Sequence, residues 1–166
     1  MWDRSRRHNF RITLDTGCVN ARQMDADLNQ LETWNKAGRI SLQRSRVLLE
    51  ELQGQQRIAK AHSFNPQPPL WTLDRSSLGP GEQAVLAARM PEEDVLTRIL
   101  FPTTRGLTAG HRRDAQHLQW HVHTGGDLFV TRDGDFLRHH QELYHIGFWV
   151  FRPAEAVAHV ERWLPS

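Results

Sequence analysis

The chain has 166 residues, of which 24% are charged and 39% are hydrophobic. This length and composition are typical of a single globular domain and argue against a disordered chain. No apolar run approaches the roughly 20 residues that a membrane-spanning helix requires, so no membrane partner is expected. The formal net charge of +2 is slight and does not by itself identify a partner.

Arginine dominates the basic residues. Of 21 lysines and arginines, only Lys36 and Lys60 are lysines. Because arginine binds phosphate bidentately and stacks on bases, a polyanionic partner is permitted. The single cysteine, Cys18, cannot form an internal disulfide or a cysteine zinc cluster, which agrees with a reducing compartment. The basic extension over residues 1–10 has no apolar stretch behind it, unlike a secretory signal, so a cytoplasmic location is predicted.

Strands and helices are predicted to alternate in the first half of the chain. Residues 11–14 are typical of a strand, and the apolar residues that follow recur every three or four positions, as on one face of a helix: Met24, Leu28, Leu31, Trp34 and Ala37. Asn20 is a candidate N-cap for this helix, and Gly38 is a candidate stop. A strand over 39–42, a helix over about 44–61 and a variable loop over 64–81 complete this half.

The second half continues the alternation. Helices are predicted over residues 82–90, 91–101, 112–123, 136–143 and 153–164, and strands over 127–131 and 148–151. Pro91 suits a first helical turn, and Gly125-Gly126 suits a helix end. Strands that alternate with helices indicate an α/β fold, so we expect one three-layer domain over 1–166 with a central, mainly parallel sheet flanked by helices.

Acidic residues follow two of the predicted strands. Asp15 comes directly after the first strand, and Asp133 and Asp135 come after the strand over 127–131. Because ligands of an open α/β sheet collect outside the carboxyl ends of its strands, these acids can converge. Two carboxylates repel by about 4 kcal/mol at 4 Å and an effective dielectric of 20, and a divalent cation relieves the repulsion. A metal-dependent site is therefore predicted.

Four acidic segments occur in a characteristic order: Leu14-Asp15-Thr16, Val47-Leu-Leu-Glu-Glu51-Leu52, Asp114-Ala115 and Phe129-Val-Thr131-Arg-Asp133-Gly-Asp-Phe136. In this order they resemble a PIN domain, the metal-dependent nuclease fold of many bacterial toxin ribonucleases. The resemblance extends over about residues 12–155. It implies that the catalytic and metal-binding acids are Asp15, Glu51, Asp114 and Asp133, with Asp135 as a further ligand candidate and Thr131 and Thr16 in supporting roles. Glu51 is preferred to Glu50 because Leu52 follows it, as in the family's glutamate-leucine pair.

The function implied by this resemblance is divalent-metal-dependent endoribonuclease activity that leaves a 3′-hydroxyl and a 5′-phosphate. Mg²⁺ or Mn²⁺ would bind the acids, lower the pKa of a bound water and stabilise charge on the phosphate. Expected partners are an RNA substrate, an antitoxin protein if the chain is a toxin, and a second copy of the chain. A non-catalytic PIN-like module that binds RNA or protein and a phosphatase of small phosphoesters stay open as alternatives.

Structural roles compete with catalytic ones for the same acids. Asp15 could cap the next helix, Asp114 could favour the dipole of a helix whose first turn it occupies, and Asp133-Gly134 could form an ordinary turn. One glutamate of the Glu50-Glu51 pair is expected to be solvated.

Two further groups of residues bear on the site. Asp114, His117 and His121 are spaced three and four apart, so one helix face could instead hold zinc. Three arginines flank the proposed acids and are predicted to bind RNA phosphates, the alternative being a solvated surface: Arg112, Arg113 and Arg132.

Overall fold

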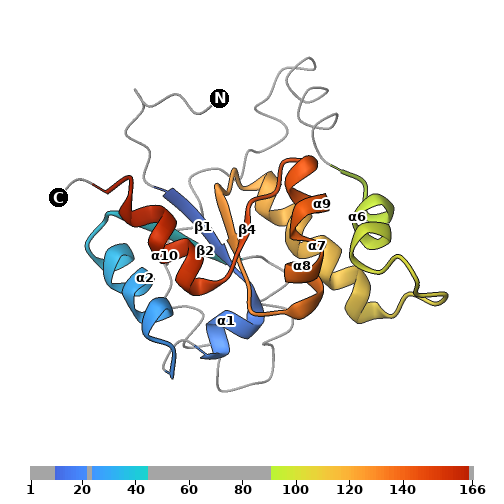
Figure 1. Ribbon diagram of the computed structural model, residues 1–166, viewed down its shortest axis with the longest axis horizontal. Coiled ribbons are helices and arrows are strands. Elements are labelled where there is room, and N and C mark those ends of the chain that lie inside the picture. The colour runs from blue at the N-terminus through green and yellow to red at the C-terminus, as the bar shows by residue number, and fades with distance from the viewer. Residues whose placement is uncertain (1–9, 22–23, 45–90, 165–166) are drawn as a thin grey trace, which may run out of the picture.

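A four-stranded, all-parallel sheet lies at the centre of the computed structural model, which describes residues 10–21, 24–44 and 91–164 (Figure 1). The strand order is β2-β1-β3-β4, so the first strand is central. The strands are β1 (Phe10–Leu14), β2 (Ile40–Arg44), β3 (Leu128–Val130) and β4 (Val150–Phe151). β1 pairs on both sides, with Ile12 opposite Leu42 of β2 and Leu128 of β3. The predicted parallel α/β fold is confirmed.

Helices cover both faces of the sheet. They are α1 (Thr16–Ala21), α2 (Ala26–Lys36), α6 (Glu93–Leu100), α7 (Ala109–His123), α8 (Gly134–Arg138), α9 (His140–His145) and α10 (Pro153–Glu161). In Figure 1, α2 and α10 lie on one side of the strands, and α7, α8 and α9 lie on the other. This is the predicted three-layer arrangement. No helix in the described part of the chain is long and apolar enough to cross a membrane.

Alternation along β1 divides the core into two layers. Ile12 and Leu14 pack with α2 and α10 in one apolar cluster. Phe129 of β3 packs with α6, α7 and α8 in a second cluster on the other face. Because successive strand residues point to opposite faces, Thr13 and Asp15 face the second cluster and α7. This alternation turns polar side chains of the central strand toward α7.

The structure corrects the predicted start of α2. We predicted Asn20 as the N-cap, but α1 ends at Ala21 and the cap of α2 is Asp25, whose Oδ1 accepts hydrogen bonds from Asp27 N (3.0 Å) and Leu28 N (3.1 Å). Met24, counted as part of the apolar helix face, is 95% exposed. Aspartate is as good an N-cap as asparagine, so the local pattern could not decide between two nearby caps. The predicted stop at Gly38 is confirmed, since its φ is +69°.

The later helices also differ from their predicted bounds. α7 begins at Ala109 because the Thr108 hydroxyl accepts a hydrogen bond from His111 N (3.3 Å) while His111 Nδ1 accepts one from Thr108 N (3.2 Å). This reciprocal cap normally uses Glu or Gln in place of His, so it was missed. Glu92 is the N-cap of α6, which leaves Pro91 before the helix. The predicted helix over 136–143 is two helices, α8 and α9, separated at His139.

Several predictions concern residues that the structure does not describe. These are residues 1–9 of the extension predicted over 1–10, whose last residue, Phe10, begins β1 instead. They are also residues 45–61 of the helix predicted over about 44–61, whose first residue, Arg44, ends β2 instead. The helix over 82–90, the loop over 64–81, and both Glu50 and Glu51 are likewise not described. They stay predictions.

Candidate functional site

The carboxyl ends of β1 and β3 meet at one edge of the sheet. Leu14 lies opposite Val130, and Asp15 N donates a hydrogen bond to Val130 O (3.1 Å). The next residues on the two strands, Asp15 and Thr131, are therefore neighbours. The Thr131 hydroxyl donates a hydrogen bond to Asp15 Oδ2. It also accepts one from Asp133 N (2.9 Å). One threonine thus connects two of the predicted acidic positions across the strand ends.

Asp15 is almost completely buried, with 6% of its surface exposed. Its Oδ1 accepts a hydrogen bond from Cys18 N (2.7 Å), which confirms the predicted alternative that Asp15 caps the helix after β1. Burial raises the pKa of Asp15, while hydrogen bonds from Thr131 and Cys18 and the proximity of His117 lower it by less. Burial also raises the pKa of the Cys18 thiol, so Cys18 stays protonated. A nearby cation would stabilise the ionised form of a buried carboxylate of this kind.

Histidines of α7 run alongside β1 and match its spacing. His121 Nδ1 is 2.8 Å from the Thr13 hydroxyl. His117, 3% exposed, lies close enough to Asp15 to influence its pKa. The four residues from His117 to His121 advance about 6 Å along the helix, and the two residues from Thr13 to Asp15 advance about 6.6 Å along the strand. The spacing of the two histidines therefore matches the spacing of Thr13 and Asp15. The sequence predicted His117 only as part of a zinc-binding helix face, and its proximity to Asp15 depends on how α7 lies on the sheet.

Asp114 lies one turn of α7 beyond His117. Because His121 lies beside Thr13 and His117 is near enough to Asp15 to influence its pKa, the next turn places Asp114 toward the carboxyl edge of the sheet. Asp114 is half-buried there. It is the sixth residue of α7, so the predicted alternative, a first-turn acid that favours the helix dipole, is wrong.

Asp133 and Asp135 belong to the start of α8. Asp133 is exposed and is the N-cap of α8, because its Oδ1 accepts a hydrogen bond from Asp135 N (2.8 Å). Asp133 therefore has a structural role, but as a helix cap, since Gly134 begins α8 and does not form the predicted turn. Asp135 Oδ1 forms an ion pair with Arg138 (3.3 Å). Thr16, predicted as a supporting residue, is the first residue of α1.

The candidate metal-binding side chains of the described residues do not gather around one point. Within residues 10–21, 24–44 and 91–164, no three His, Cys, Asp or Glu side chains are close enough to share one metal ion. Asp114, His117 and His121 therefore do not form the alternative zinc site. His121 is a core residue instead: complete burial lowers its pKa to about 3, and its ring packs edge-on against Phe129. The carboxylates of Asp15 and Asp133 are hard oxygen donors suited to Mg²⁺, but such a site needs a further ligand, for which Glu51 is the predicted residue.

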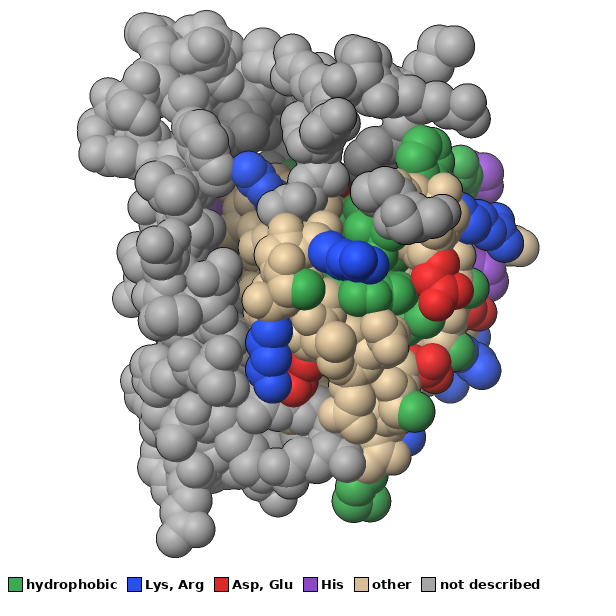
Figure 2. All heavy atoms as spheres, turned by 90° about the vertical axis from the view of Figure 1, so that its left-hand side faces the viewer, with side chains coloured by type: hydrophobic (Ala, Val, Ile, Leu, Met, Phe, Trp, Pro, Cys, Tyr) green, Lys and Arg blue, Asp and Glu red, His purple; other side chains and the backbone are tan. Residues whose placement is uncertain are grey.

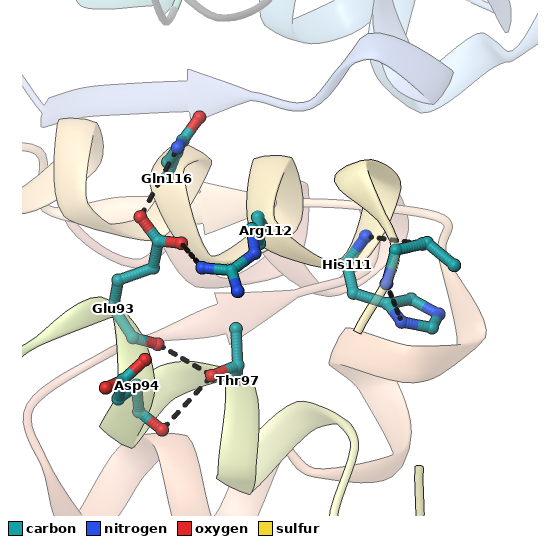
Figure 3. A network of polar contacts seen from close by, with 7 residues as sticks. Glu93, Asp94, Thr97, His111, Arg112 and Gln116 are labelled. Atoms are coloured by element: carbon teal, nitrogen blue, oxygen red, sulfur yellow. Dashed lines mark hydrogen bonds and ion pairs between the residues drawn. The ribbon is translucent and has the colours of Figure 1, made fainter. Parts of the chain in front are cut away.

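Arg112 has a structural partner that the sequence did not predict. Its Nη1 is 3.4 Å from Glu93 Oε1 of α6, and Glu93 also accepts a hydrogen bond from Gln116 (3.3 Å), as Figure 3 shows. The Thr97 hydroxyl donates to backbone oxygens of the same helix in this view. Arg112 therefore connects α7 to α6, while Arg113 is exposed.

Other basic side chains lie nearer the strand ends. Figure 2, which looks onto the side where α2 lies in Figure 1, shows Lys and Arg side chains standing apart on the described surface. In contrast, three arginines line one surface hollow of about 520 Å³, together with Gly134, Leu137 and Pro153: Arg132, Arg138 and Arg152. Arg132 lies between Thr131 and Asp133, so the hollow adjoins the acidic edge. Arg132 was predicted to bind phosphate, whereas Arg138 and Arg152 were missed because they come from different elements.

Comparison of the chain with protein-family models, curated proteins and solved structures finds no match.

Proposed function

We propose that the chain is a divalent-metal-dependent nuclease that hydrolyses RNA. The observation that carries the proposal is the pair of hydrogen bonds of the Thr131 hydroxyl, which links the Asp15 carboxylate to the backbone of Asp133. These residues follow adjacent parallel strands, at the edge where α/β proteins bind ligands. The order of the acidic segments in the sequence and their resemblance to PIN domains support the same assignment.

Asp15 and Asp133 are the proposed metal ligands at this edge, with Glu51 as the further ligand. Asp114 and Asp135, which were predicted as ligands, do not gather with Asp15 and Asp133 around one ion in the part of the chain that the structure describes. Mg²⁺ or Mn²⁺ bound there would supply a water of lowered pKa and would stabilise charge on the phosphate and on the leaving oxygen.

The chain's own residues prepare this edge in three ways. Thr131 and Cys18 N hold one carboxylate oxygen of Asp15 each, which fixes the orientation of the carboxylate. Burial excludes water from Asp15, and the neighbouring His117 favours the ionised form of the carboxylate. Arg132, half-exposed beside Asp133, is placed to attract a phosphate.

Cleavage of a labelled RNA by chelator-treated protein tests the proposal, with Mg²⁺, Mn²⁺ or Zn²⁺ restored in turn. Asp15→Asn and Asp133→Asn should each abolish cleavage, because a neutral amide binds these cations weakly. Both variants should fold, since asparagine caps helices as well as aspartate does, and thermal melting checks this. Glu161→Gln, at the exposed end of α10, is the matched control.

Further variants separate the individual assignments. Glu51→Gln should abolish activity and Glu50→Gln should leave it unchanged; the reverse result would exchange their roles. Full cleavage by the Asp15→Asn or the Asp133→Asn variant would remove that residue from the site. Activity restored by Zn²⁺ alone would contradict a site built from hard oxygen ligands.

A second candidate function is a non-catalytic module that binds RNA, which the three-arginine hollow favours. RNA binding without metal-dependent cleavage would support it. Turnover of a small chromogenic phosphodiester without cleavage of RNA would instead support a phosphatase of small phosphoesters. A role as a toxin with a small antitoxin partner rests only on the family resemblance.

A further inference from the structure

We infer that the arginine-lined hollow and an aromatic groove beside β4 together bind one nucleotide of the substrate, outside the acidic edge. The phosphate group would occupy the hollow and the base would lie in the groove. The inference rests on the proposed function for its substrate class, an RNA strand, but not for any step of catalysis.

The hollow has the charge that a phosphate group requires. Among the described residues that line it, three are arginines and none is acidic. Arg132 and Arg138 have carboxylate partners at its margins, Asp25 at 3.9 Å and Asp135 at 3.3 Å, and both arginine side chains are at least half exposed. Exposed ion pairs of this kind are weak, so the guanidinium groups can bind a phosphate instead. Arginine also presents a planar fork of donors that matches phosphate oxygens.

The groove has the aromatic surface that a base requires. It has a volume of about 520 Å³ and is lined along α9 and β4 by His140, Gln141, Tyr144, His145, Phe148, Trp149, Val150 and Phe151. Tyr144 is 56% exposed, and its ring packs edge-on against Trp149 with 5.5 Å between centroids. Trp149 in turn contacts Phe151. These contacts hold a ring in place while leaving Tyr144 accessible for stacking.

The hollow and the groove adjoin, because residues that line them are neighbours in the chain on both of their walls. On one wall, Arg138 ends α8 and His140 begins α9, with one residue between them. On the other wall, Phe151 ends β4 and Arg152 follows it directly. β4 is the outermost of the four described strands on its side of the sheet, and α9 lies beside it in Figure 1. A phosphate in the hollow therefore has the groove next to it.

This combination favours an unpaired nucleic acid strand over other occupants. An aromatic ring can stack on a base only when the base is free of a helix, and positive charge beside stacking rings is the usual surface for single strands. An exposed strand edge can also pair with another protein chain. Three arginines at the end of the groove favour a polyanion, however, so we assign the groove to a nucleotide.

Fluorescence anisotropy with a labelled single-stranded RNA tests the inference, in chelator so that no cleavage occurs. Arg138→Gln and Arg152→Gln should each weaken binding, and the two changes together should reduce the slope of log affinity against log salt by about 0.7, the value for one lost phosphate contact. Tyr144→Ala should weaken binding about 5-fold or more without changing that slope, because the lost interaction is stacking. A duplex of the same sequence should bind more weakly than the single strand.

Two control variants make the same kinds of substitution, arginine to glutamine and aromatic residue to alanine, outside the hollow and the groove. Arg105→Gln removes an exposed arginine of the loop before α7, and Trp163→Ala removes a partly exposed aromatic residue after α10, beyond the opposite end of that helix. Neither should change binding, and thermal melting excludes unfolding. Unchanged RNA binding by the Arg138, Arg152 and Tyr144 variants would overturn the inference, as would equal affinity for duplex. If Tyr144→Ala were the one variant without an effect on RNA binding, the base would not lie in the groove, and a protein partner would become its expected occupant. If the protein did not cleave RNA in the metal assay, the proposed function would fail, but the binding measured here in chelator would still decide this inference.

Discussion

Gly126→Ala should destabilise the protein strongly, although it adds only a methyl group. A Cβ at this position would lie 2.2 Å from His121 Nδ1, 2.4 Å from His121 Cε1 and 2.9 Å from the Thr13 hydroxyl. His121 is 2% exposed and packs against the rings of Phe129 and Phe148, so its ring has little room to move. The methyl group must therefore displace the ring and break the hydrogen bond between His121 and Thr13.

The size of the effect follows from these two costs. Overpacking a core costs about 1–3 kcal/mol, and a lost buried hydrogen bond costs about 1 kcal/mol, so the free energy of unfolding should fall by about 3 kcal/mol. For a chain of this length the Tm should fall by roughly 6–12 °C. Gly106→Ala is the control, because nothing lies within 4 Å of its added Cβ, and its Tm should change little.

A double-mutant cycle identifies the cause. If the clash with the ring is responsible, His121→Ala creates the space that the new methyl group needs, and adding Gly126→Ala to it should cost no further stability. Thermal melting and urea unfolding measure all four proteins. A Tm of Gly126→Ala within about 2 °C of wild type, or fully additive effects in the cycle, would refute the reasoning.

Two further predictions concern the same layer of the protein. The pKa of about 3 for buried His121 lies below its value of about 6.5 in the unfolded chain, so the unfolded state binds a proton first as the pH falls. This group should therefore lower the free energy of unfolding by about 2 kcal/mol between pH 7 and pH 5. Urea unfolding at pH 7 and at pH 5 measures the loss, which should be smaller by this amount in His121→Gln. Burial of Asp15 acts in the opposite direction, because its raised pKa favours the native state as that carboxylate becomes protonated. Thr131→Val should lower the free energy of unfolding by about 1–3 kcal/mol, because it leaves the Asp15 carboxylate and the Asp133 N–H without their hydrogen-bond partner, and it should reduce RNA cleavage. Thr131→Ser keeps the hydroxyl and should therefore keep both the stability and the cleavage of the wild type. Equal behaviour of the two variants would show that the Thr131 hydroxyl has neither role.

Local patterns were sufficient for much of the fold. The apolar segment at 11–14 predicted β1, and the alternation of strands and helices predicted the parallel sheet and its three layers. Gly38 and Gly125 end helices with positive φ, as their positions in the sequence indicated. Helix starts were less predictable, because Asp25 and Thr108 were among several polar residues that could cap a helix. A choice between neighbouring caps depends on tertiary packing, which fixes where each helix must begin.

The sequence by itself determined which residues stand at the carboxyl ends of the strands, including Asp15, Thr131 and Asp133. That placement is a local property, because it depends only on where each apolar segment stops. The tertiary structure alone decided that β1 lies beside β3, that α7 brings His117 near enough to Asp15 to influence its pKa, and that Arg138 and Arg152 join Arg132 in one hollow. These contacts join residues that are distant in the chain. No local period encodes them, since they are set by how strands pair and how helices pack on the two faces of the sheet.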